Sequence, residues 1–200
     1  MLAAPTKDRI LDAALVSFGS RGYEATSLDA LASGLSLSKQ SILYHFSSKE
    51  SLLEAVIDRS AWELSTALEA ALRRAGAGLE RVEAVVRSVF QLAGRRPQLL
   101  GLVREVSRLG PPATTRLMGA LDPLVARATG FLEAEMAAGR MRRQDARLLL
   151  LNAYSVVIGA ATEVEVLRAL GYEPTARSLV RRRTELMMFL RSALTPAPVP

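Results

Sequence analysis

Apolar residues recur at three- and four-residue spacing along most of the chain, which is the period of an amphipathic helix. The first apolar face comprises Ile10, Leu11, Ala14, Leu15 and Phe18. No segment shows a convincing alternation of apolar and polar residues, which would indicate a β-strand. The hydrophobic pattern therefore predicts an all-α fold.

Turn and capping residues mark the ends of the first two helices. The first helix is expected over residues 7–20 and ends before Gly22, because glycine readily adopts positive φ. Thr26 or Ser27 is expected to cap the second helix, with Asp29 completing a capping box. The buried face of this second helix consists of Leu28, Leu31 and Ala32.

A third short helix follows after a turn at residues 34–36. Ser38 is a natural N-cap for it, and Leu37 is placed to pack against Ile42 as a hydrophobic staple. The helix is expected to end near Phe46. The two short helices and their turn have the spacing of a helix-turn-helix motif.

Beyond Lys49 the helical period continues in longer segments separated by glycine and proline. Their expected ranges are 47–75, 79–93, 95–110, 114–138, 145–170 and 174–194. The chain is thus predicted to contain about nine helices. We expect a helix-turn-helix domain over residues 1–50 and a larger helical domain over residues 51–200.

Composition narrows the possible chemistry. The chain has no cysteine and a single histidine, His45. These counts exclude disulfides and cysteine metal sites, and they argue against a histidine metal site or a catalytic dyad. We therefore predict no catalytic residue, no metal site and no cofactor. An enzyme that uses scattered carboxylates remains the catalytic alternative.

The net charge of +6 invites an interpretation as nucleic-acid binding, but its distribution does not support one. Residues 1–60 carry six Lys/Arg and seven Asp/Glu, whereas the remaining residues carry twenty Arg and thirteen Asp/Glu. The positive excess thus lies outside the helix-turn-helix segment, so overall basicity is weak support. The placement of lysine is more specific, because Lys7, Lys39 and Lys49 all lie in the first quarter of the chain.

No stretch is long enough to cross a bilayer, since the longest nearly uncharged segment is residues 148–162. The first ten residues lack the apolar core of a signal peptide. We therefore expect a soluble, cytoplasmic protein with no membrane partner.

The third helix divides into two faces. Ile42 and Phe46 share the core side, while Lys39, Gln40 and Tyr44 lie on other faces. Glutamine pairs with adenine in the major groove, and lysine reaches guanine or phosphate. This pattern is typical of a recognition helix. The alternative is that the polar residues form an ordinary solvated surface and that Tyr44 packs at the edge of the core.

These features together resemble the TetR family of bacterial transcriptional regulators. The matching segments are RILDAALVSFGSRGYEATSLDALA and LSKQSILYHFSSKESLLEAV, and the resemblance covers residues 7–56. It is specific because the RGYEATS bridge and the YHFSSKE ending occur at the family's spacing. The remaining helices resemble the family in layout only.

The resemblance implies roles for individual positions. Thr26, Ser27 and Lys49 would contact phosphate, and the recognition helix would supply contacts to bases or to the backbone. The full DNA-contacting set is Thr26, Ser27, Ser38, Lys39, Gln40, Ser41, Tyr44, His45 and Lys49. Two positions depart from the family pattern: Ser36 replaces a turn glycine, and Leu43 stands where a tyrosine is usual. Leu43 would instead touch a thymine methyl group or pack.

The resemblance also implies partners. It predicts a homodimer through the last two long helices, double-stranded and roughly palindromic operator DNA, and an unidentified small-molecule effector. The candidates for the dimer interface are the small residues from Ala153 to Ala161 and Leu179, Leu186, Met187, Leu190 and Leu194, with the alternative that they belong to the chain's own core. The candidate effector-binding residues are Trp62, Phe90, Leu100, Met118, Phe131, Asn152, Tyr154 and Glu163.

The resulting hypothesis is a ligand-responsive transcriptional repressor without catalytic activity. The alternative is a helical ligand-binding or scaffold protein that binds no operator.

Overall fold

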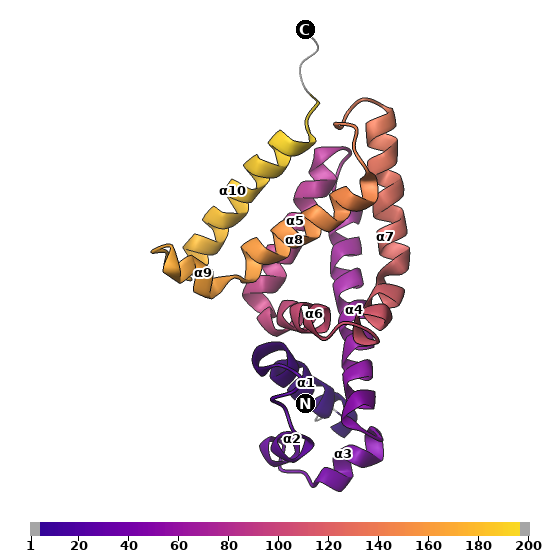
Figure 1. The fold of residues 1–200 in the computed structure, drawn as a ribbon, viewed down its shortest axis with the longest axis vertical. Helices are drawn as coiled ribbons and strands as arrows, with labels where there is room; N and C mark the ends of the chain where they lie inside the picture. Colours follow the sequence, from indigo (N-terminus) through magenta and orange to yellow (C-terminus); the bar gives the residue numbers. More distant parts are fainter. Residues whose placement is uncertain (1–4, 197–200) are drawn as a thin grey trace. The chain divides into compact units, whose positions relative to one another are not determined.

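The computed structural model describes residues 5–196, over which it contains ten α-helices and no strand (Figure 1). The first four residues of the segment considered for a signal peptide lie outside this range. The helices are α1 (Thr6–Arg21), α2 (Leu28–Gly34), α3 (Lys39–His45), α4 (Lys49–Arg73), α5 (Leu79–Arg95), α6 (Pro97–Leu109), α7 (Ala113–Ala137), α8 (Ala146–Thr162), α9 (Val164–Ala169) and α10 (Ala176–Leu194). The predicted all-α fold is confirmed. None of the described helices is long and apolar enough to cross a membrane.

One predicted helix is divided in the structure. The segment expected to be continuous over residues 145–170 consists of α8 and α9, which are separated at Glu163. The backbone of Glu163 has ψ 72°, outside the helical region, and its N–H donates to Gly159 O at 2.9 Å. Neither glycine nor proline marks this break, which is why the helical pattern did not reveal it. Glu163 therefore lies at a helix end and not within an apolar helix.

The helices group into two compact units. The first comprises the described residues up to Leu64 together with Arg96–Leu121. The second comprises Ser65–Arg95 and the described residues from Asp122 onward. Helices α4 and α7 each contribute to both units, so the units do not correspond to a single cut in the sequence.

In the first unit, α6 packs closely against α1. A Cβ atom built on Gly101 would lie 2.0 Å from Gly19 O, and one on Gly19 would lie 2.2 Å from Gln98 O. Both distances are too short for any side chain, so two glycines permit this approach of the helices. Phe18 and Leu99 are completely buried in this unit. The helix-turn-helix segment is thereby attached to a helix far along the chain.

In the second unit, α10 packs against α5 and α8, and α5 also contacts α8. Leu186, Leu190 and Leu194 of α10 are buried within the chain's own core, and so is Ala161 of α8. These four candidates for the dimer interface therefore belong to the chain's own core, which is the alternative that their apolar pattern leaves open. The apolar pattern of a helix marks a buried face without indicating which partner buries it.

Candidate nucleic-acid interface

Helix α3 is anchored by its apolar side. Ile42 is completely buried and Phe46, which follows the helix, is 5% exposed. The Ser38 hydroxyl caps the helix by accepting from the Ser41 N–H at 3.1 Å, as its sequence position predicted. Tyr44, by contrast, is 86% exposed. The helix thus has one fixed side and one side available for a partner.

The polar residues of the predicted set lie along this free side. Lys39 and Gln40 are exposed in the first turn of α3, and Ser41 and His45 are half-buried beside them. The Ser38 and Ser41 hydroxyls lie 2.9 Å apart, and the rings of Tyr44 and His45 meet edge-on with centroids 5.2 Å apart. Leu43 is also partly exposed next to Tyr44, which leaves it free to touch a thymine methyl group.

The start of α2 differs from the prediction for Thr26. Ser27 is the N-cap, because its side chain accepts from the Ala30 N–H at 3.1 Å. Thr26 is only 2% exposed and its hydroxyl donates to Gly22 O at 2.9 Å. Its side chain therefore stabilises the turn after α1, whereas the exposed Ser27 remains suited to a phosphate contact. Two adjacent hydroxyl residues could not be distinguished by pattern alone.

The turn between α2 and α3 is a Schellman motif with serine at the position that glycine usually occupies. The Leu37 N–H donates to Ala32 O at 2.9 Å, and the Ser36 N–H donates to Ser33 O at 3.1 Å. Ser36 adopts φ 56°, the left-handed conformation that disfavours a Cβ atom. The turn therefore has the same geometry as it would with the glycine that is usual at this position. Because serine carries a Cβ atom, the backbone at Ser36 is strained.

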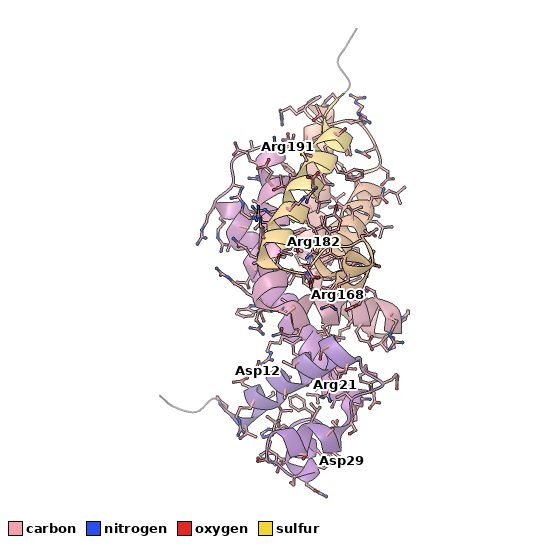
Figure 2. All side chains as sticks on the ribbon, turned by 90° about the vertical axis from the view of Figure 1, so that its left-hand side faces the viewer. Asp12, Arg21, Asp29, Arg168, Arg182 and Arg191 are labelled. Atoms are coloured by element: carbon pink, nitrogen blue, oxygen red, sulfur yellow. The ribbon has the colours of Figure 1, made fainter. Side chains whose placement is uncertain are left out.

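Two cations of the predicted set are held in different ways. Lys39 Nζ lies 2.9 Å from Asp29 Oδ2 of α2, and both side chains are exposed (Figure 2 labels Asp29). An exposed pair of this kind contributes little to stability, so phosphate can replace Asp29. Lys49 Nζ instead lies over the Tyr23 ring, 4.1 Å from its centroid. Asp29 thus pairs with Lys39 and does not complete the predicted capping box.

The surroundings of Tyr23 were not predicted from the sequence. The Tyr23 hydroxyl donates to Glu50 Oε1 at 3.0 Å, and its backbone N–H donates to Glu105 Oε1 of α6 at 2.7 Å. Burial, followed by the hydrogen bond to Glu50, raises the Tyr23 pKa to about 12. Tyr23 lies within the RGYEATS segment, but nothing local indicated that Glu105 would meet it.

The predicted effector-binding residues differ widely in burial. Trp62 and Met118 are 69% and 51% exposed, whereas Leu100 and Phe90 are core residues. Leu100 belongs to the first unit and Phe90 to the second. All four residues are large and apolar, a property that occurs at both core and surface positions.

The remaining candidates lie in the second unit. Phe131 packs against the core cluster around Leu132, with the Arg81 guanidinium 5.4 Å from its ring centroid. Asn152 and Tyr154 are exposed on α8, and Glu163 lies at the helix break. Surface grooves occur between α1 and α2 and between α5 and α10, but neither is lined by any of the eight candidates.

The helix-turn-helix segment has a clear relationship to known proteins. The family model for bacterial regulatory proteins of the tetR family matches residues 10–56. This part of the chain is therefore similar to the DNA-binding domain of tetR-family regulators. The match includes α2, α3 and the start of α4, which carry the exposed polar residues described above.

Two characterised relatives extend this comparison. The negative transcriptional regulator IcaR of the biofilm operon icaADBC, from Staphylococcus aureus (strain Newman), is 44% identical over 48 residues, which are 24% of this chain and 26% of IcaR. The chain thus spans about a quarter of the length of this relative. The transcriptional activator FasR of Mycolicibacterium smegmatis is 31% identical over 139 residues, or 66% of this chain and 63% of FasR.

The likeness to solved structures extends over nearly the whole chain. The ketosteroid transcriptional regulator KstR2 of Mycobacterium tuberculosis superposes with a TM-score of 0.75 and covers 98% of each chain, at 17% sequence identity. At this identity the likeness shows a shared fold. The helices beyond α4 therefore share the fold of this regulator, although their sequence holds no comparable motif.

Proposed function

We propose that the chain is a DNA-binding transcriptional regulator that inserts α3 into the major groove of an operator. The observation that carries the proposal is the division of α3 into a buried side, held by Ile42, and an exposed side that presents Gln40 and Tyr44. A helix anchored in this way can project side chains to base edges without losing its own packing. The match of residues 10–56 to the family model supports the same function. In this proposal residues 1–50 bind DNA and residues 51–200 serve regulation and dimerisation.

The residues have different roles in the proposed complex. Gln40 and Tyr44 read bases, whereas Ser27, Lys39 and Lys49 bind phosphate and set the orientation. Ser38 and Ser41 hold the first turn of α3 through their mutual contacts. His45 supports the Tyr44 ring from the side.

We further propose a homodimer formed through α8 and α10. Leu148 and Leu151 of α8 and Phe189 of α10 are large apolar residues that are each more than half exposed. Exposed apolar side chains on two neighbouring helices are suited to cover the same surface on a second copy. A two-fold dimer presents two α3 helices to successive major grooves, so the operator is expected to be roughly palindromic.

The proposed mode of regulation is repression relieved by a small-molecule effector. A dimer on an operator that overlaps a promoter blocks transcription, and an effector releases it by favouring a dimer whose α3 spacing no longer fits. IcaR is a negative regulator and FasR an activator, so the similarity to IcaR over the DNA-binding domain supports repression. Identification of an effector would locate its site among the candidates Phe131, Asn152, Tyr154 and Glu163.

Binding to the DNA upstream of the chain's own gene tests the central proposal. Fluorescence anisotropy with this DNA and with an unrelated duplex should give salt-sensitive binding that is tighter for the upstream fragment. Lys49→Ala should weaken binding to both and reduce the slope of log K against log salt by about 0.9. Arg73→Ala, at the end of α4, is the matched control and should leave the slope unchanged. Binding to neither duplex would favour the scaffold alternative.

Sedimentation of the full chain tests the proposed dimer. Leu151→Glu introduces a charge into the proposed surface and should shift the protein to monomer, because burying an unpaired carboxylate is costly. Leu170→Glu is the control, since Leu170 is 69% exposed after α9 and lies outside the proposed surface. Equal behaviour of the two variants would argue against an interface on α8 and α10.

A further inference from the structure

Tyr23 contacts three other residues of the first unit, two through its side chain and one through its backbone. Its ring lies under the Lys49 ammonium, its hydroxyl donates to Glu50, and its backbone N–H donates to Glu105 on α6. We propose that Tyr23 is a positioning residue for the DNA phosphate contact of Lys49, and that Glu105 holds Tyr23 in place for this role. This inference rests on the proposed function, because it concerns how a DNA contact is made.

The ring can place Lys49 without competing with phosphate. A cation over an aromatic face is attracted by the ring's charge distribution and keeps its N–H donors available. Among the described residues, Lys49 forms no ion pair with a carboxylate, whereas Lys39 is paired with Asp29. Lys49 is also half-buried, so its motion is restricted in the absence of DNA. Of the two lysines, Lys49 is therefore the one whose ammonium group is held in place, with its N–H donors available, before DNA binds.

The position of the ring is fixed from three directions. Tyr23 is 9% exposed and packs against Phe18, with ring centroids 5.5 Å apart. Its hydroxyl is held by the Glu50 carboxylate at 3.0 Å. Lys49 and Glu50 are the first two residues of α4, so the ring contacts the end of the helix at which phosphate would bind.

Glu105 supplies the third constraint from a distant part of the sequence. Its Oε1 accepts from the Tyr23 N–H at 2.7 Å, and the carboxylate also pairs with Arg108 through two contacts of 2.8 Å. The hydrogen bonds from Arg108 are the main reason that the Glu105 pKa is lowered, so the acceptor remains charged. The Tyr23 backbone is thus hydrogen-bonded to α6. A substitution at Glu105 should therefore alter the position of the Lys49 side chain.

Proton NMR of the free protein tests the geometry without any substitution. Protons above an aromatic face are shifted upfield, so the Lys49 side-chain methylene signals next to the ammonium should lie upfield of those of Lys39. The chain has three lysines, Lys7, Lys39 and Lys49, so single Lys→Arg variants assign the signals. Equal positions for Lys49 and Lys39 would overturn the inference, even if the protein binds DNA as proposed.

DNA binding by Tyr23 variants tests the role. Tyr23→Leu removes the ring and should weaken binding about two- to five-fold, the range expected for a cation–π contact whose cation is still partly solvated. Tyr23→Phe keeps the ring and should retain most of the affinity and the salt slope. Equal losses in the two variants would exclude the ring as the element that places Lys49.

The Lys49→Ala background separates positioning from a general structural role. If Tyr23 acts through Lys49, Tyr23→Leu should cause no further loss once Lys49 is absent. Glu105→Ala should likewise weaken binding in the wild-type background and have little effect in Lys49→Ala. Equal losses in both backgrounds would overturn the proposal. Failure of the wild-type protein itself to bind DNA would instead overturn the proposed function.

Discussion

Replacement of Ser36 by glycine should stabilise the protein. Ser36 occupies the left-handed position of the Schellman turn with φ 56°. For a residue with a Cβ atom this conformation costs about 1–2 kcal/mol, and glycine avoids the cost. Glycine loses more conformational freedom on folding, which offsets about 0.5–1 kcal/mol of the gain. Ser36 is exposed, and among the described residues its hydroxyl has no hydrogen-bond partner to lose. The net expectation is a gain of about 0.5–1 kcal/mol.

Thermal unfolding of the full chain, followed by circular dichroism, measures this gain. For a chain of this size it corresponds to a rise in Tm of about 1–4 °C. All variants must be compared at one protein concentration, because the proposed dimerisation would make Tm depend on concentration. Amide exchange at Ser36 and Leu37 reports on the turn itself, since their N–H groups make the two Schellman bonds.

Two companion variants test the reasoning. Ser36→Val should destabilise the protein, because a β-branched side chain is strongly disfavoured at positive φ. Gly34→Ala should stabilise it by about 0.5–1 kcal/mol, since Gly34 is within α2 and a Cβ atom there would meet no other atom within 4 Å. A neutral or destabilising Ser36→Gly, or a tolerated Ser36→Val, would refute the assignment of strain to this turn.

Two further predictions concern recognition and acid stability. Gln40→Ala or Tyr44→Ala should reduce discrimination between operator and unrelated DNA by about 1–3 kcal/mol, as measured by competition binding; a uniform loss on both duplexes would assign that residue to the backbone. The Glu105 pKa is lowered by Arg108 from its ordinary value of 4.5, so its contribution to stability is present above that value and is lost as the pH falls below it. In the wild-type protein the free energy of unfolding, measured with urea, should therefore fall as the pH drops below about 4.5, and Glu105→Gln should make this fall smaller. An equal fall in the variant would contradict this prediction.

Local signals in the sequence predicted much of the recognition segment. Ser38 was identified as a cap and Ile42 as an anchor, and both have these roles. Such features depend on residues within one or two helical turns of each other, so spacing reveals them. The departure at Ser36 was also visible, although its left-handed backbone became apparent only in the structure.

Other assignments depended on contacts that spacing does not encode. Thr26 and Ser27 are adjacent hydroxyl residues, yet packing buries one and leaves the other as the cap. Leu186 and Leu190 were apolar on the expected face, but the face packs within the same chain. Trp62 and Met118 were suitable in size for a ligand pocket and proved to be exposed.

The sequence by itself determined the all-α fold, the order of the helices and the separation of buried from exposed residues on α3. These properties follow from helical periodicity and capping, which act over a few residues. Only the tertiary structure placed Glu105 against Tyr23, although 82 positions separate them in the chain. The close approach of α1 and α6 at Gly19 and Gly101 brings these residues together, and no local pattern specifies which distant helix a buried face will meet.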